Sequence, residues 1–199
     1  MARHDRVRSS SGARASIAAV AARLIAEDGI TDFHLAKRKA ARQLGLAEHV
    51  AFPDNAEVEA ELRAYRSLYQ GEEHEALIAE LRQEALDLLE LLVGFNPYLT
   101  GSVLEGTAGE NSRIDILLFA DSAKEVEIFL LNRGIDVSHG EARSERVEAV
   151  LIIETPTAEA NLIVMPPLLE RVSLKRRDGR TSERIRADAL RILLAESAV

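Results

Sequence analysis

The residues with the clearest capacity for chemistry lie in one stretch of the chain. Gly101-Ser102 follows the apolar run Tyr98-Leu99, and Arg113-Ile114-Asp115 comes after ten further residues. A glycine lets the backbone approach a phosphate closely, and exposed amides together with a serine hydroxyl can hold phosphate oxygens. The same residues also fit plain structural roles: Gly101 as a turn at a strand end, Ser102 as a helix cap, and Asp115 as a surface acid paired with Arg113 or Arg133.

The spacing of these residues resembles the signature of nucleotidyltransferases of the DNA polymerase β superfamily. That signature is a strand ending in Gly-Ser, a loop containing glycine, and then Ser followed by Asp-apolar-Asp on the next strand. The loop of residues 104–109 and the following Ser112 are similar to the pattern of the bacterial members. The resemblance covers about residues 95–167.

The resemblance implies both a fold and a reaction. The expected fold class is α/β (α+β): a small mixed sheet with flanking helices of the polymerase-β nucleotidyltransferase type, preceded by a helical region. A nucleoside triphosphate would be the substrate, Mg²⁺ the cofactor, and a hydroxyl group the acceptor of the nucleotidyl group. Asp115 would be the catalytic and metal-binding residue, and Gly101, Ser102 and Arg113 would bind the nucleotide.

Two of the three expected metal-binding carboxylates are replaced in this chain. Arg113 stands at the first position, and Asn161, on the strand before Met165-Pro166-Pro167, stands at the third. At an effective dielectric constant of about 20, one unit charge ~4 Å away contributes about 4 kcal/mol, and a divalent ion doubles that. Ordinary two-metal catalysis is therefore not expected, whereas Arg113 can clamp phosphate without a metal. Four nearby acids are candidate substitutes for the lost carboxylates: Glu105, Glu110, Glu154 and Glu159.

The first half of the chain reads as helices. Asp32 and Asn55 are expected N-caps, and Gly29 and Gly45 stand where helices usually stop. The expected helices cover residues 15–28, 33–44, 55–69 and 73–93.

The second half has short apolar runs separated by Gly, Asn, Ser and Pro, which favours strands alternating with helices. We expect strands at 98–100, 113–120, 147–155 and 160–165, a helix at 123–132, and a C-terminal helix at 181–196 with Ile185, Ala189, Ile192 and Leu193 facing inward. The last two strands form an antiparallel hairpin through Pro156 and Thr157. The predicted division is a flexible N-terminus (1–14), a helical accessory region (15–94) and a nucleotidyltransferase-like domain with its C-terminal helix (95–199).

Composition limits the other classes of function. The chain has no cysteine and a net charge of -8, which excludes Cys-based zinc sites and thiol nucleophiles and argues against a surface devoted to nucleic acid. The Ala-rich stretch from Ala15 is broken by Arg23, so neither a signal peptide nor a membrane span is expected, and we predict a soluble, cytoplasmic protein without membrane partners. A homo-oligomer is conceivable, and no Gly-x-x-x-x-Gly-Lys-Ser/Thr loop supports a kinase or ligase.

The alternative hypothesis is a non-catalytic regulatory or interaction protein whose helical half binds DNA or a partner. Residues 37–46 resemble the first helix and turn of a helix-turn-helix motif. No convincing recognition helix follows at once, since the stretch 47–54 is short and contains Pro53. Nucleic acid is therefore an unlikely partner on this pattern alone.

Overall fold

The computed structural model describes residues 2–46, 51–69, 71–142, 144–175 and 181–197, with only the backbone described for residues 2–11 and 69. The chain divides into two compact units, residues 1–74 and 75–199. The boundary lies earlier than the predicted division after Gly94. The helix that follows Gly71 explains this, because its apolar side belongs to the core of the second unit.

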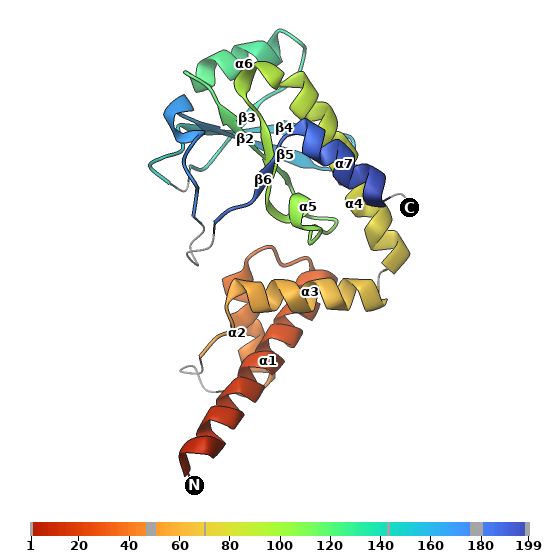
Figure 1. The fold of residues 1–199 in the computed structure, drawn as a ribbon, viewed down its shortest axis with the longest axis vertical. Helices are drawn as coiled ribbons and strands as arrows, with labels where there is room; N and C mark the ends of the chain where they lie inside the picture. The colour runs from red at the N-terminus through yellow and green to blue at the C-terminus, as the bar shows by residue number, and fades with distance from the viewer. Residues whose placement is uncertain (1, 47–50, 70, 143, 176–180, 198–199) are drawn as a thin grey trace. The chain divides into compact units, whose positions relative to one another are not determined.

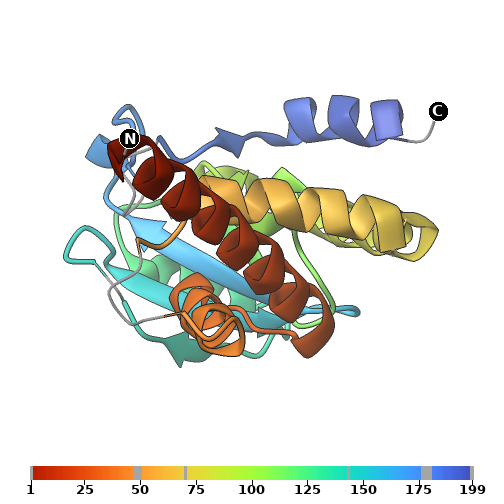
Figure 2. The same cartoon turned by 90° about the horizontal axis from the view of Figure 1, so that it is seen from below.

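Three helices make up the first unit: α1 (Ala2–Asp28), α2 (Phe33–Gln43) and α3 (Asn55–Tyr69). They enclose a core of small and aliphatic side chains, among them Ile17, Val58 and Leu62. Alanine predominates on the facing sides of α1 and α2, which lets the two backbones approach closely. Figure 2 shows α1 as a long helix (dark red), which begins at Ala2.

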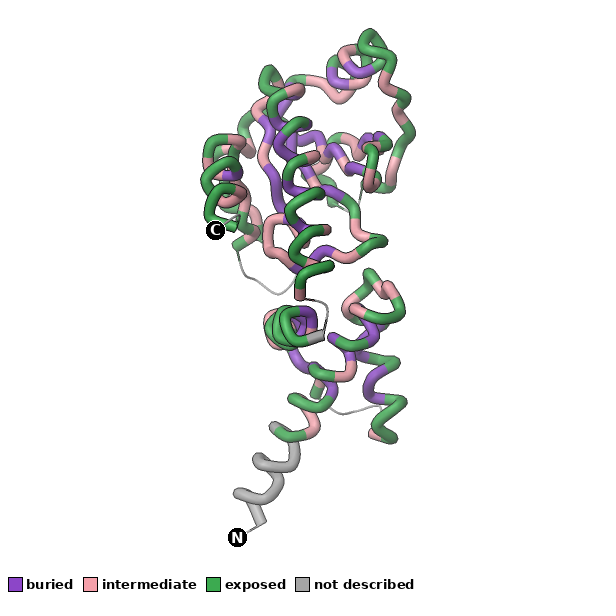
Figure 3. The backbone as a smooth tube through the Cα atoms, turned by 90° about the vertical axis from the view of Figure 1, so that its right-hand side faces the viewer, coloured by how far each residue is buried: buried purple, intermediate pink, exposed green. Residues whose placement is uncertain are grey.

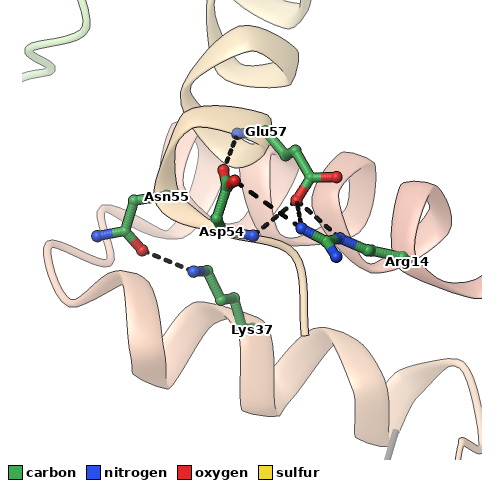
Figure 4. Close-up of polar contacts among 5 residues, drawn as sticks. All are labelled: Arg14, Lys37, Asp54, Asn55 and Glu57. Atoms are coloured by element: carbon green, nitrogen blue, oxygen red, sulfur yellow. Dashed lines mark hydrogen bonds and ion pairs between the residues drawn. The ribbon is translucent and has the colours of Figure 1, made fainter. Parts of the chain in front are cut away.

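The helix caps of this unit explain where α2 and α3 begin. The Asp32 carboxylate accepts hydrogen bonds from the backbone of His34 and Leu35, as the sequence predicted. At α3 the cap is Asp54 rather than the predicted Asn55: Asp54 Oδ1 accepts from Glu57 N at 2.9 Å, and Glu57 Oε2 accepts from Asp54 N at 2.7 Å (Figure 4). This reciprocal arrangement is a capping box.

Asn55 takes part in a different contact. Its side-chain oxygen accepts a hydrogen bond of 2.6 Å from Nζ of Lys37, which ties α2 to α3 (Figure 4). Lys37 is 7 % exposed. Among the described residues, the next helix after α2 begins at Asn55. Residues 47–50, which follow the turn of the helix-turn-helix-like stretch directly, lie outside the described part of the chain.

The second unit combines a mixed sheet with helices (Figure 1). Its helices are α4 (Gly71–Leu91), the short α5 (Gly101–Glu105), α6 (Ala123–Leu131) and α7 (Ala187–Ser197), and 3-10 turns cover Val93–Phe95 and Pro167–Leu169. The strands are β1 (Tyr98–Thr100), β2 (Ile114–Phe119), β3 (Ser138–Gly140), β4 (Ala149–Glu154), β5 (Glu159–Met165) and β6 (Arg184–Ile185). The described residues thus give a mixed α and β fold, in agreement with the predicted class.

Among the described residues, the six strands lie in the order β3-β4-β5-β2-β1-β6. The central pair β2 and β5 is parallel, with Asp115 opposite Asn161, whereas β1 runs antiparallel to β2, with Thr100 opposite Asp115. The predicted hairpin of β4 and β5 is confirmed. This register places the ends of β1, β2 and β5 that carry the candidate site residues next to one another.

The two faces of the sheet differ in their cover. Ile114, Ile116 and Leu118 point into the main core together with the apolar side of α4 (Figure 3 colours the buried strands purple). Alternate residues point the other way, where Leu117 and Phe119 form a smaller cluster with Met165. Asp115 belongs to this second face by its position on β2.

Helix α7 lies beside α4, to which it is joined by an ion pair of 2.6 Å between Arg191 and Glu90 (Figure 1). The helix begins at Ala187 rather than at 181. Ile185 lies in β6, so it does not set the inward face of the helix: Leu190 is fully buried and Ile192 is 62 % exposed, the reverse of the predicted orientation for Ile192. No helix in the described ranges is long and apolar enough to cross a lipid bilayer.

Candidate functional site

The turn from β1 into α5 brings Gly101 against the carboxylate of Asp115. Gly101 has a φ of 76°, a left-handed conformation that is costly for any residue with a side chain. A Cβ atom placed on Gly101 would lie 2.7 Å from Oδ2 of Asp115. Both the backbone conformation and the space therefore require glycine here, and the two ends of the Gly-Ser to Asp motif lie in direct contact.

Ser102 follows within the first turn of α5. Its carbonyl oxygen accepts hydrogen bonds from the backbone of Thr107 at 2.9 Å and Ala108 at 3.1 Å, which folds the loop after α5 back onto the helix. The side chain is half-buried, and its hydroxyl has no hydrogen-bond partner within the part of the chain that the structure describes. Among the described residues, Ser102 is thus not a side-chain cap.

Two cross-strand pairs lie side by side on the same sheet face as Asp115. Nδ2 of Asn161 donates a hydrogen bond of 2.8 Å to Oδ1 of Asp115. Arg113 precedes Asp115 by two residues and Glu159 precedes Asn161 by two residues; Nη2 of Arg113 lies 2.5 Å from Oε2 of Glu159. Residues two apart on a strand share a face, so these four residues form one group, which we call the polar cluster.

The polar cluster does not fit a pair of divalent cations. It holds two carboxylates, one guanidinium and one amide, and the only acid of the expected Asp-x-Asp pair is Asp115. Oδ1 of Asp115 is engaged by the amide of Asn161, and the position of the first carboxylate carries a cation. Magnesium requires a nearly octahedral set of oxygen ligands, which this donor set does not supply.

The four candidate substitute acids do not converge on Asp115. Glu159 is held by Arg113, Glu154 lies opposite Glu159 at the end of the hairpin and is exposed, and Glu110 is exposed in the loop. Glu105 lies in α5 with its Oε1 atom buried. Among the described residues, no group of three or more His, Asp or Glu side chains is arranged to hold a metal ion.

A buried arginine supports α5 from below. Nε of Arg82, on α4, donates to the carbonyl oxygen of Val103 at 3.1 Å, and its Nη2 donates to that of Leu104 at 2.9 Å. Burial lowers the pKa of this guanidinium. The contact satisfies carbonyl groups that a short helix leaves without partners at its end, and it fixes the turn that carries Gly101 and Ser102.

A second polar group borders the aromatic residues of the same sheet face. Tyr98 donates a hydrogen bond of 2.9 Å to Glu170, which also accepts one from Arg186. The guanidinium of Arg184 lies 4.8 Å from the Tyr98 ring and 5.1 Å from the Phe119 ring, a cation–π geometry. This group attaches the segment after β5 to the sheet.

The sequence patterns do not single out Arg82, and they suggested Glu159 only as a substitute for a lost metal-binding carboxylate, not as the partner of Arg113. Arg82 gives no local signal, because a single arginine on a helix looks like a solvated charge. Glu159 does give a sequence signal, because it precedes Asn161 by two residues, just as Arg113 precedes Asp115. If the two strands are assumed to pair in parallel, this spacing predicts an ion pair between Arg113 and Glu159. The plain structural role considered for Asp115, a surface acid paired with Arg113 or Arg133, names the wrong partners. Arg113 contacts Glu159, and Arg133 lies over the Phe129 ring.

The chain matches no protein-family model, no curated protein and no solved structure. The function must therefore be argued from the geometry of these residues.

Proposed function

We propose that this protein is a nucleotidyltransferase-like nucleotide-binding protein in which metal-dependent transfer is lost. One observation carries the proposal: the Asp115 carboxylate lies against Gly101 while its neighbours are an amide and an ion-paired guanidinium. The Gly101-Ser102 turn offers a triphosphate a close backbone approach and a hydroxyl that has no hydrogen-bond partner among the described residues. Arg113 adds a cation within the same cluster, which suits phosphate and opposes a metal.

Within this proposal each residue has a separate task. Gly101 and Ser102 hold phosphate oxygens, and Arg113 neutralises part of the phosphate charge that Mg²⁺ would neutralise in an active relative. Asp115 keeps its place beside the turn, and Asn161 orients it. Transfer to a hydroxyl acceptor would need a group that activates that hydroxyl. Both carboxylates of the polar cluster are already engaged, Asp115 by Asn161 and Glu159 by Arg113.

Calorimetry with ATP, CTP, GTP and UTP tests the binding step directly. We expect binding of at least one triphosphate in the presence of EDTA, with little gain when magnesium is added, because the cation that faces the phosphates is Arg113. The absence of binding to all four triphosphates would remove the proposal.

The loss of metal dependence is tested by restoring the carboxylates with the double variant Arg113→Asp/Asn161→Asp. We expect triphosphate binding to become dependent on magnesium in this variant. The matched control is Asn132→Asp/Arg133→Asp, which makes the same change of charge at exposed positions after α6. Equal magnesium dependence in the control and the restored variant would contradict the assignment of the ligand positions.

A further inference from the structure

The exposed side of α2 carries three cationic side chains that lie next to one another on the helix surface. The helix buries Ala36, Lys37, Ala40 and Ala41, and its outward residues Leu35, Arg38, Lys39 and Arg42 follow the spacing i, i+3, i+4, i+7 of a single helix face. Lys37 is turned toward Asn55 and does not belong to this side. We call Arg38, Lys39 and Arg42 the basic face.

No acid neutralises the basic face in the described part of the chain. None of its three residues forms an ion pair or side-chain hydrogen bond there, and α2 itself contains no Asp or Glu. Like charges four residues apart, as in Arg38 and Arg42, destabilise a helix by about 0.2–0.5 kcal/mol. The helix dipole offsets this only for Arg42, in the last turn. A contribution to the stability of α2 therefore does not explain why the three cations of the basic face lie together.

Charge is also distributed unevenly along the chain. The first 46 residues contain nine Lys and Arg against four Asp and Glu, a net charge of +5, whereas the remaining residues contain 16 against 29, a net charge of -13, which together give -8. A polyanion would thus be attracted to α2 and repelled by most of the rest of the chain. The overall acidic balance, which argued against nucleic acid, hides this local excess of positive charge.

We infer that the basic face binds the phosphate backbone of duplex DNA without reading its sequence. An 11-residue helix is about 16 Å long and fits a major groove about 12 Å wide. The outward side of α2 has no Phe, Tyr or Trp on which unpaired bases could stack, which disfavours single strands. The major groove of A-form RNA is too narrow for this contact, and the apolar side of α2 is buried in the core rather than free to enter a membrane.

The strength of this contact follows from the number of cations. Each phosphate neutralised contributes about -0.9 to the slope of log K against log salt, so three contacts give a slope of about -2 to -3. Binding of this kind is independent of the nucleotide site proposed above, and it does not require Gly101, Ser102 or the polar cluster.

The test uses the full chain and a short fluorescent DNA duplex of random sequence, with anisotropy measured over a series of salt concentrations. The variant Arg38→Ala/Lys39→Ala/Arg42→Ala removes the basic face and keeps a strong helix former at each position, which circular dichroism verifies. The matched control, Lys124→Ala/Arg146→Ala/Arg171→Ala, removes three exposed cations of the second unit. We expect a loss of affinity of about tenfold or more at low salt for the first variant, with a shallower salt slope, and a change within about twofold for the control.

Several outcomes would overturn the inference. Failure of the unmodified protein to bind the duplex at low salt is one, and an equal loss of affinity in the control variant is another. Tighter binding to an RNA duplex of the same sequence, or to anionic lipid vesicles, would assign the basic face to a different partner. If light scattering showed that the triple variant has a smaller assembly mass, the occupant would be an acidic surface of a second copy of this chain.

Discussion

Two small groups of polar residues, one in each unit, use nearly the same chemistry and differ in what holds them. In the first unit, Arg14 donates to Glu57 from Nε at 2.8 Å and from Nη2 at 2.6 Å (Figure 4). In the second unit, Arg113 and Glu159 form a comparable ion pair, and their side chains are exposed to a similar degree. An asparagine lies beside each pair.

The difference lies in the backbone. Glu57 Oε2 also accepts a hydrogen bond from the amide of Asp54, so the carboxylate that pairs with Arg14 also holds the first turn of α3. The structure gives the Arg113–Glu159 pair no such role in the backbone, because both residues lie at strand ends. The same pair of side chains therefore supports a helix start in the first unit and joins two neighbouring strands in the second.

The largest expected effect comes from Gly101→Ala, which tests how firmly the second unit holds the Asp115 carboxylate against this turn. The left-handed backbone costs about 1–2 kcal/mol for a residue with a Cβ, and the overlap with Asp115 adds to that, for a total loss of about 2–4 kcal/mol of unfolding free energy. Urea denaturation measures this loss. Triphosphate binding should be lost with it, because Asp115 and the turn can no longer keep their contact.

Gly134→Ala is the matched control, since Gly134 has a φ of 72° and no atom lies within 4 Å of the position that a Cβ would occupy there. It should show only the backbone cost. In the double variant Gly101→Ala/Asp115→Ala the extra cost should fall to the level of the control. A Gly101→Ala protein as stable as Gly134→Ala would show that the Asp115 carboxylate moves aside freely.

A smaller effect is expected for Glu57, and it would sharpen the contrast between the units. Glu57→Ala removes the capping box and should lower the unfolding free energy by about 1 kcal/mol, whereas Glu61→Ala, at an exposed position of the same helix, should change it by less than about 0.5 kcal/mol. Thermal or urea unfolding distinguishes the two. Equal effects would mean that the contacts of Glu57 add nothing to α3.

The same residue carries a pH dependence. The hydrogen bonds from Arg14 hold the pKa of Glu57 below its ordinary value of 4.5, so its contribution to stability is complete above that value and is lost as the pH falls through the lowered pKa. Glu57→Gln should therefore show a shallower loss of stability than the unmodified protein below pH 4.5. Parallel acid titrations of the two proteins would contradict this assignment.

The smallest effect on stability is expected for Glu159→Gln. An exposed ion pair contributes about 0.2–1 kcal/mol, and the freed Arg113 should raise triphosphate affinity about threefold, which corresponds to about 0.6 kcal/mol. Calorimetry in the Arg113→Ala background decides the mechanism. If Glu159→Gln gives the same gain there, Glu159 acts by repelling phosphate and not by holding Arg113.

The sequence predicted the central elements because their patterns are local. The Asp32 cap, the strand of residues 98–100 and the hairpin around Pro156 each depend on neighbouring residues, and the structure agrees with them. The edge strands β3 and β6 could not be read in this way. Each has only two or three residues, and each exists because a neighbouring strand provides hydrogen bonds.

The candidate site shows the same limit. The spacing from Gly101 to Asp115 was visible in the chain, and so were the substitutions at Arg113 and Asn161. Which carboxylate holds Arg113 depends on the parallel pairing of β2 with β5, residues far apart in sequence. Lys37 is likewise buried where it donates to Asn55, a residue 18 positions later in the chain, and only the structure separates it from its exposed neighbours.

The contact between Gly101 and Asp115 also constrains the order in which this chain can diverge. The restriction runs one way: a side chain at position 101 would overlap the carboxylate at 115, whereas a shorter side chain at 115 meets no steric obstacle. No comparable steric overlap links Arg113 and Asn161, so mutations can change these two positions one at a time. A change at position 101 therefore has to follow a change at position 115, whereas positions 113 and 161 can change at any stage.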